Sequence, residues 1–203
     1  KLLDLDPLKS APKRQTLDIL REPLVKRYQD IFKENYSLIV HCAAYTDVVK
    51  AETERMTCYD TNVIGTRHLA NLGIPMLYIS TEYVFDGTKG NYAECDYPNP
   101  INFYAFTKLL GEYESRRTRS VVVRCLFKPR PFEHAAACYD QFTSGDYVDR
   151  IAQELVLAIE KFEQLPGTIH IGTGRKSTLE LAELTKPGIS SISINEITNV
   201  KLP

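Results

Sequence analysis

The sequence MLYISTEYVFDG at residues 76–87 contains a short apolar run that ends abruptly in polar side chains. Residues Met76–Ser80 predict a fully buried strand, because a strand of a parallel sheet is covered on both faces and reads as a continuous hydrophobic run. Three further runs of this kind lie outward from it along the chain, at Leu38–Ala43, Ser120–Cys125 and Thr168–Ile171.

Helical patterns separate these strands. Apolar residues at helical spacing predict helices over Pro23–Tyr36, Thr57–Leu72, Tyr104–Arg117 and Tyr147–Leu165. The capping-box spacing at Ser177–Glu180 predicts the start of another helix. Strands that alternate with helices imply βαβ units, so we expect an α/β fold with a parallel sheet and a functional site at the carboxyl ends of its strands.

Composition narrows the class of protein. The chain has 203 residues, of which 43% are hydrophobic and 25% charged, and its formal net charge is −1. These values are typical of a soluble globular protein, and they argue against intrinsic disorder and against nucleic-acid binding by phosphate neutralisation. No apolar run reaches the ~20 residues of a membrane helix, and no secretory signal opens the chain. We therefore expect a cytoplasmic protein with no nucleic-acid or membrane partner.

The cysteines and histidines do not indicate a metal site. The five cysteines contain no CxxC pair, and the four histidines are equally scattered. Neither set has the spacing of zinc ligands, so we expect no metal and reduced thiols. Cys42 and Cys125 lie in strand-like runs, and we interpret them as small buried hydrophobic residues.

Tyr104 and Lys108 lie one helical turn apart on one face of a predicted helix. A positive charge beside a phenol favours the phenolate and lowers its pKa from about 10 toward neutrality. Such a pair can donate a proton to a carbonyl that is being reduced, or remove one from an alcohol. Spacing alone leaves open a surface pair with no chemical role, because Tyr and Lys are both common in this chain.

Polar and small residues follow two of the predicted strands. Ser80 and Thr81 end the run at 76–80, where a hydroxyl can hydrogen-bond a substrate carbonyl. A capped turn closed by Asp86-Gly87 is the alternative. Ala43 and Ala44 follow the preceding strand, where small side chains let a flat ring or a ribose approach the backbone. Close packing of strand on helix explains these alanines equally well.

Three other features complete the candidates. Asn62 and Asn102 are suited to support such a crevice, and either can equally be a helix-end residue. Segment Gly172–Ser177 superficially suggests a phosphate-binding loop, but it lacks the glycine spacing of a Walker motif, which favours a turn into the capped helix.

Four segments follow one another along the chain: HCAAYTD (41–47), DTNVIGT (60–66), ISTEYVFDG (79–87) and the run from Pro100 to Glu112, which contains YAFTKLLGE. In this order and spacing they resemble the extended short-chain dehydrogenase/reductases, and most of all their dTDP-4-dehydrorhamnose reductase group. The resemblance implies a Rossmann-type, doubly wound parallel sheet with a small C-terminal substrate lobe. Residues 1–125 would form the cofactor-binding core and residues 126–203 the smaller substrate-binding portion.

The resemblance also implies an activity. It is the reduction of a nucleotide-linked 4-keto-6-deoxy sugar by NADPH (or NADH), as in dTDP-rhamnose biosynthesis. Tyr104 matches the family's proton donor, Lys108 the residue that lowers the phenol's pKa and holds the nicotinamide ribose, and Thr81 the hydroxyl that polarises the keto group. The residues that match cofactor-binding positions are Ala43, Ala44, Tyr45, Ser80, Tyr104 and Lys108. Those assigned to the substrate are Thr81, Glu82, Tyr83 and Asn102, with Glu82 standing where Asp is more usual.

The sequence departs from the family pattern in two places. Nothing upstream of Ile39 resembles the first strand and the glycine-rich loop that hold the pyrophosphate, and Leu2–Asp6 instead resembles the second strand. The stretch Cys125–Gly145 is also shorter than the family's substrate-binding segment. Either the natural chain is truncated, or the sequence lacks residues that the natural chain contains at these two places. We favour the second explanation, because deletion of a central strand from a parallel sheet would expose its neighbours.

Two other functions stay open. An epimerase or dehydratase of the same family would need a further acid/base group near the keto carbon, for which Glu82 is the candidate. A non-catalytic regulatory subunit that keeps the fold would explain the missing glycine-rich loop.

The choice of cofactor and the oligomeric state are separate questions. Asp4 and Asp6, near the expected second strand, favour NADH over NADPH. The oligomeric state is open, with a homodimer among the candidates.

Overall fold

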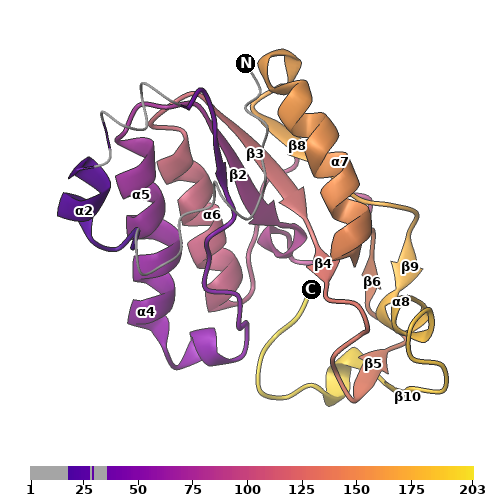
Figure 1. The fold of residues 1–203 in the computed structure, drawn as a ribbon. Coiled ribbons are helices and arrows are strands. Elements are labelled where there is room, and N and C mark those ends of the chain that lie inside the picture. The colour runs from indigo at the N-terminus through magenta and orange to yellow at the C-terminus, as the bar shows by residue number, and fades with distance from the viewer. Residues whose placement is uncertain (1–17, 28, 30–35) are drawn as a thin grey trace.

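Parallel strands and the helices between them form the main body of the chain. In the computed structural model, which describes residues 18–27, 29 and 36–203, the main sheet has the strand order β1-β2-β3-β8, and every neighbouring pair is parallel. The four predicted buried strands are confirmed to within two residues at each end, whereas the strand expected at Leu2–Asp6 lies outside the described residues. Their bounds are β1 (Ile39–His41), β2 (Met76–Thr81), β3 (Ser120–Cys125) and β8 (Thr168–His170) (Figure 1).

Helices connect these strands. Between β1 and β2 the chain is helical from Arg55 to Ala70, so the helix predicted over Thr57–Leu72 is confirmed with each end two residues earlier. This stretch consists of α4 (Arg55–Tyr59), a π-helical segment η2 (Asp60–Ile64) and α5 (Gly65–Ala70). Helix α6 (Phe103–Ser115) links β2 to β3, and α7 (Val148–Glu160) precedes β8.

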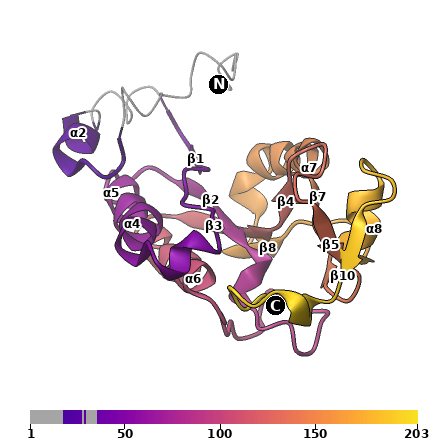
Figure 2. The ribbon, with the colours of Figure 1, turned by 90° about the horizontal axis from the view of Figure 1, so that it is seen from below.

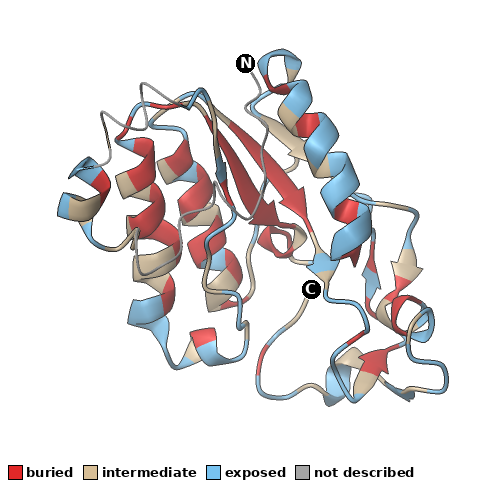
Figure 3. Cartoon of the chain, in the orientation of Figure 1, coloured by how far each residue is buried: buried red, intermediate tan, exposed pale blue. Residues whose placement is uncertain are grey.

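The two faces of the sheet are covered by different helices, as a doubly wound fold requires. Side chains alternate along a strand, so Met76 and Tyr78 face one side of β2 while Leu77 and Ile79 face the other. The first pair packs with residues of α2 (Glu22–Arg27) and α5, and the second pair packs with residues of α7. Figure 2 shows these helix groups on either side of the strands, and Figure 3 shows that β2 and β3 are buried. The predicted Rossmann-type fold is confirmed.

A smaller lobe, on the lower right of Figure 1, is built from short segments that follow β3. Its helix α8 (Thr178–Glu183) starts at the predicted capping box, in which Ser177 and Glu180 each accept the other's backbone N–H. The strand pairs are β4 (Phe127–Lys128) with β7 (Asp146–Tyr147), β5 (Ala136–Cys138) with β10 (Ser190–Ile192), and β6 (Phe142–Thr143) with β9 (Lys176–Ser177). The lobe falls within residues 126–203, although β8 joins the main sheet, and the domain division stays a prediction.

Three further expectations have different outcomes. Cys125 is buried as predicted, but Cys42 is exposed, because β1 ends at His41 and Cys42 begins the following loop. Of the helix predicted over Pro23–Tyr36, the described part comprises α2 and the helical residue 29, and the remainder lies outside the described residues. Within the described ranges, no helix combines the length and apolar character that crossing a membrane requires.

Candidate active site

The candidate site lies where β1 and β2 end, beside the first turn of α6. The strands are parallel, so these ends share the carboxyl edge of the sheet. Asn102 fixes the start of α6, because its side-chain oxygen accepts a 2.8 Å hydrogen bond from the backbone N–H of Ala105. Its amide nitrogen donates a 3.0 Å hydrogen bond to the backbone oxygen of Lys201. Asn102 is therefore a helix cap, and its predicted contact with substrate stays a prediction.

Tyr104 and Thr81 meet at this edge. Thr81 ends β2, and its hydroxyl accepts a 3.2 Å hydrogen bond from the N–H of Tyr83, which caps the short helix η3 (Glu82–Val84). Burial and the nearby Tyr83 raise the pKa of Tyr104 above its ordinary value, while a hydrogen bond with the Thr81 side chain lowers it. The net effect is upward, so Tyr104 keeps its proton at neutral pH.

Lys108 lies one turn beyond Tyr104, and its ammonium group is directed at β2. The residue is 3% exposed, and its Nζ donates a 2.6 Å hydrogen bond to the backbone oxygen of Ile79 and lies 4.3 Å from the centre of the Tyr78 ring. Burial lowers the pKa of Lys108 to about 8. Burial is the largest influence on the pKa of Tyr104, and the Lys108 ammonium is hydrogen-bonded to β2, so the predicted effect of Lys108 on the phenol stays a prediction.

The loop after β1 is held by the π-helical segment. Asn62, buried in η2, accepts a 2.8 Å hydrogen bond from the N–H of Tyr45 and donates one of 3.2 Å to the backbone oxygen of Tyr45. The same amide nitrogen donates a 2.9 Å hydrogen bond to the hydroxyl of Thr107 on α6. Asn62 thus ties this loop to α6, as expected of a residue that supports the crevice. Ala43 is exposed and Ala44 is half-buried, so both are open to a ligand.

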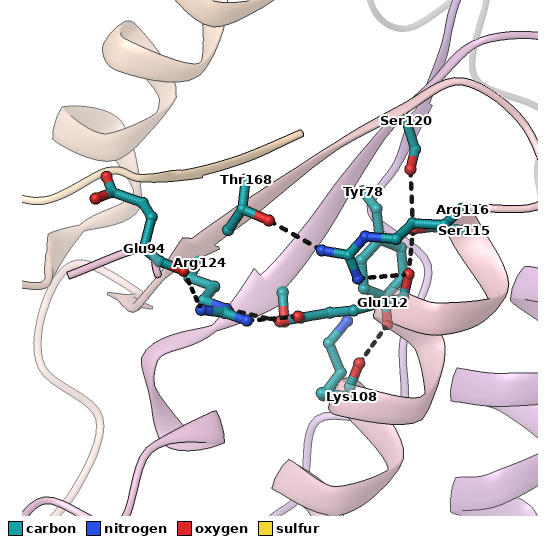
Figure 4. A network of polar contacts seen from close by, with 10 residues as sticks. Tyr78, Glu94, Lys108, Glu112, Ser115, Arg116, Ser120, Arg124 and Thr168 are labelled. Atoms are coloured by element: carbon teal, nitrogen blue, oxygen red, sulfur yellow. Dashed lines mark hydrogen bonds and ion pairs between the residues drawn. The ribbon is translucent and has the colours of Figure 1, made fainter. Parts of the chain in front are cut away.

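Ser80 faces the opposite side of β2 from Thr81. It is buried, and its hydroxyl donates a 2.6 Å hydrogen bond to the carboxylate of Glu112, which forms an ion pair with Arg124 (Figure 4). The cofactor contact predicted for Ser80 stays a prediction. Glu112 and Arg124 were not among the candidates from sequence. The available signal was the arginine within the apolar run Val121–Cys125, since a charge in a buried strand requires a buried partner.

Two predicted substrate residues connect the sheet to the smaller lobe. Glu82 is half-buried, and its carboxylate accepts a 2.6 Å hydrogen bond from the hydroxyl of Thr143 in β6. Burial raises the pKa of Glu82. Tyr83 is 8% exposed, and its burial raises the pKa of its phenol, while the nearby side chain of Gln141 acts in the opposite direction. Both side chains reach the smaller lobe, and their roles in substrate binding stay predictions.

A cavity of about 740 Å³ lies between the loop after η3 and the smaller lobe, with Glu82 in its wall. Two aromatic features line it. The rings of Phe85 and Tyr92 stack with centres 4.3 Å apart, and the guanidinium of Arg175 lies 3.6 Å from the centre of the Phe142 ring. Its volume falls within the ~300–1,000 Å³ of small-molecule sites. Aromatic faces beside a guanidinium suit a ligand that combines a planar ring with an anionic group.

Comparison with known proteins identifies relatives of the chain. The family model described as the RmlD substrate binding domain matches residues 6–128. A dTDP-4-dehydrorhamnose reductase from Aggregatibacter actinomycetemcomitans is 42% identical over 101 residues, which are 47% of this chain and 34% of the relative. Methionine adenosyltransferase 2 subunit beta from Xenopus laevis is 36% identical over 110 residues, which are 51% of this chain and 32% of the relative. The matched segments span about a third of these curated relatives.

Solved structures share the fold. The crystal structure of dTDP-4-dehydrorhamnose reductase from Bacillus anthracis in complex with NADP matches with a TM-score of 0.77 and 30% identity, over 92% of this chain and 76% of that chain. A hypothetical dTDP-4-dehydrorhamnose reductase from Sulfolobus tokodaii matches with a TM-score of 0.77 and 30% identity, over 96% and 78% of the two chains. With sequence motifs, family model and fold in agreement, the chain belongs to the RmlD substrate binding domain family of the extended short-chain dehydrogenase/reductases.

Proposed function

We propose that this protein is an NAD(P)-dependent oxidoreductase that reduces the keto group of a nucleotide-linked 4-keto-6-deoxy sugar, with NADPH as hydride donor. The observation that carries the proposal is the position of Tyr104, in the first turn of α6, beside Thr81 at the end of β2, where the Thr81 side chain lowers the pKa of the phenol against the effect of burial. Thr81 directly precedes Glu82, which lines the cavity. Relatives named dTDP-4-dehydrorhamnose reductase, one of them solved with NADP, support the same activity.

The described residues fit one end of a nicotinamide cofactor. Ala43 and Ala44 leave room beside the end of β1, Tyr45 is fixed by Asn62, and Lys108 supplies a buried ammonium. The first glycine in the sequence is Gly65, so the residues before β1 contain no glycine-rich turn for a pyrophosphate. We therefore assign residues of this chain to the nicotinamide and its ribose, and none to the pyrophosphate.

The proton chemistry follows from the side chains at the strand end. When bound, a reduced nicotinamide supplies the hydride for the keto carbon. The Thr81 oxygen accepts the N–H of Tyr83, and with substrate bound its hydroxyl donates a hydrogen bond to the keto oxygen. Tyr104 then transfers its proton to that oxygen as negative charge develops there, and the resulting phenolate recovers a proton from water. The raised pKa of Tyr104 keeps the donor protonated before each reduction.

The substrate class is supported by the cavity. A nucleotide-linked sugar carries a planar base and an anionic diphosphate, and the cavity offers the exposed ring of Phe142 together with the guanidinium of Arg175. Its position beside Glu82 allows a sugar to approach the strand end where Thr81 and Tyr104 lie. The identity of the sugar and of the base is part of this proposal.

A non-catalytic regulatory subunit is the second candidate. The observation that favours it is the 36% identity to methionine adenosyltransferase 2 subunit beta, over a stretch as long as that shared with the reductases. In this case the chain would keep the fold and bind a nucleotide ligand without turnover. The placement of Tyr104 beside Thr81 favours the reductase.

A coupled assay of binding and turnover tests the proposal. The protein is mixed with NADPH and dTDP-4-dehydrorhamnose, and oxidation is followed at the nicotinamide absorbance band. We expect turnover that falls by at least about 10²-fold in Tyr104→Phe, which lacks the transferable proton. The matched control is Tyr113→Phe on the same helix, because that side chain is 62% exposed and should be neutral. Undiminished turnover in Tyr104→Phe would contradict the mechanism, and tight NADPH binding without turnover would favour the regulatory subunit.

A further inference from the structure

The inward face of α6 is held by polar contacts rather than by large apolar side chains. Its buried residues are Ala105, Thr107, Lys108, Gly111, Glu112 and Ser115. Buried polar groups favour a position only where their hydrogen bonds are satisfied. The position of α6 on the sheet therefore depends on the hydrogen-bond partners of its buried polar side chains.

The central polar contact of α6 is a buried ion pair between Glu112 and Arg124 on β3. The side chains of Glu112 and Arg124 are 0% and 5% exposed. Arg124 donates from Nε to Glu112 Oε1 at 3.0 Å and from Nη2 to Oε2 at 2.8 Å, while Ser80 donates to Oε1 at 2.6 Å. Figure 4 shows this carboxylate reaching from α6 to the guanidinium on β3. One carboxylate thus joins α6, β2 and β3.

The same guanidinium also touches the wall of the cavity. Nη1 of Arg124 donates a 3.4 Å hydrogen bond to the backbone oxygen of Glu94, and its guanidinium carbon lies 5.1 Å from the centre of the Phe85 ring. Residues 85–92 line the cavity together with Arg124 itself. The Glu94 carboxylate in turn accepts a 3.1 Å hydrogen bond from the N–H of His170, at the end of β8. Arg124 therefore links the cavity loop to the helix that bears Tyr104.

We propose that Glu112 and Arg124 are positioning residues that hold the Tyr104 helix and the cavity loop 85–94 in one fixed arrangement. This inference rests on the proposed function, in which Tyr104 donates a proton to a substrate bound in the cavity. Glu112 lies two turns beyond Tyr104 on the same face of α6, so a shift of the carboxylate moves the phenol. A misplacement of about 1 Å at a reacting group lowers rates by about 10²-fold.

Stability and positioning can be separated at this pair. Removal of one partner leaves a buried charge without compensation, which destabilises the fold whatever the pair does for catalysis. Replacement of both charges by apolar side chains of similar volume is often neutral or stabilising. The double variant Glu112→Leu/Arg124→Met is therefore the informative one, and Glu112→Gln serves as the second measurement.

The chain offers a matched control on the same helix. Glu114 accepts two hydrogen bonds from Arg67, at 3.0 and 2.7 Å, but this pair joins α6 to α5 and does not line the cavity. The variant Glu114→Gln should leave kcat and KM unchanged. For the double variant we expect a thermal midpoint near that of the wild type, kcat lower by about 10²-fold and KM for the sugar nucleotide raised several-fold. A folded double variant with wild-type kcat and KM would overturn the proposal.

Hydrogen exchange distinguishes failure of this proposal from failure of the proposed function. If the wild type does not turn over NADPH, the reductase function is contradicted, and the positioning role is then decided by amide exchange in the cavity loop and in α6. Faster exchange over residues 85–94 and 103–115 in the double variant, but not in Glu114→Gln, supports it. Equal exchange in wild type and double variant overturns it.

Discussion

Substitution of Gly111 by alanine tests how closely α6 sits on the sheet. A Cβ atom at Gly111 would lie 2.7 Å from the backbone oxygen of Asn62 and 2.8 Å from Cζ of Tyr78, and closer still to the Tyr78 hydroxyl. Tyr78 is 1% exposed, so its ring has no free volume to enter. The helix or the ring must therefore move.

Two opposing effects set the magnitude. Alanine is better than glycine in a helix interior by about 1 kcal/mol, whereas overpacking of a filled core costs about 1–3 kcal/mol. The clash involves both a backbone atom and a fully buried ring, which puts it at the upper end. We expect Gly111→Ala to lower the free energy of unfolding by a net of about 1–2 kcal/mol. For a chain of this size that corresponds to roughly 2–8 °C in the thermal midpoint.

Urea denaturation and calorimetry of Gly111→Ala and of Gly167→Ala provide the measurement. At Gly167 no heavy atom lies within 4 Å of the added Cβ, so this variant should change stability by less than about 0.5 kcal/mol. A Gly111→Ala protein as stable as the wild type, or more stable, would refute the reasoning, because helix propensity would then outweigh the contact.

Three other changes have defined outcomes. Ser177→Ala removes the N-cap of α8 and should lower stability by about 1 kcal/mol in urea denaturation. Thr143→Val removes the hydroxyl that donates to Glu82, and the unfolding free energy should fall by about 1–3 kcal/mol. Burial, reinforced by the charge of Lys108, lowers the pKa of His41 from 6.5 in the unfolded chain to about 3. The folded state then binds fewer protons, so stability falls as pH drops below 6.5, by about 2 kcal/mol between pH 7 and 5. In His41→Gln, measured by thermal melts at both pH values, this loss should disappear.

The strands of the main sheet were predictable because a strand that is buried on both faces has a continuous run of apolar residues. Met76–Ser80 and Ser120–Cys125 are continuous apolar runs, and the structure reproduces their limits almost unchanged. The capping box at Ser177 was equally predictable, because both of its hydrogen bonds join Ser177 and Glu180, which are three residues apart in the sequence. These features depend on local sequence alone, which is why sequence reasoning finds them.

Features that depend on distant partners were not predictable. The spacing of Tyr104 and Lys108 gives a shared helix face, but the direction of the ammonium is decided by the backbone oxygen of Ile79. The strands at Ala136–Cys138 and Phe142–Thr143 are two or three residues long, which is too short to show an alternation of apolar and polar residues. Their partner strands lie about 35 to 55 residues away in the sequence. The π-helical segment around Asn62 changes the helix by one residue per turn, which no hydrophobic pattern records.

Two of the helices that cover the sheet, α6 and α7, differ in a way that stability alone does not explain. Helix α7 buries Ile151 and Ala158 against one face, as an ordinary amphipathic helix does. Helix α6 covers the other face with buried Lys108 and Glu112, whose desolvation is costly and whose replacement by apolar residues is often neutral or stabilising. Both helices cross the same strands, so packing requires charges on neither. We infer that the charges on α6 follow from the chemistry of the strand end, where that helix also presents Tyr104.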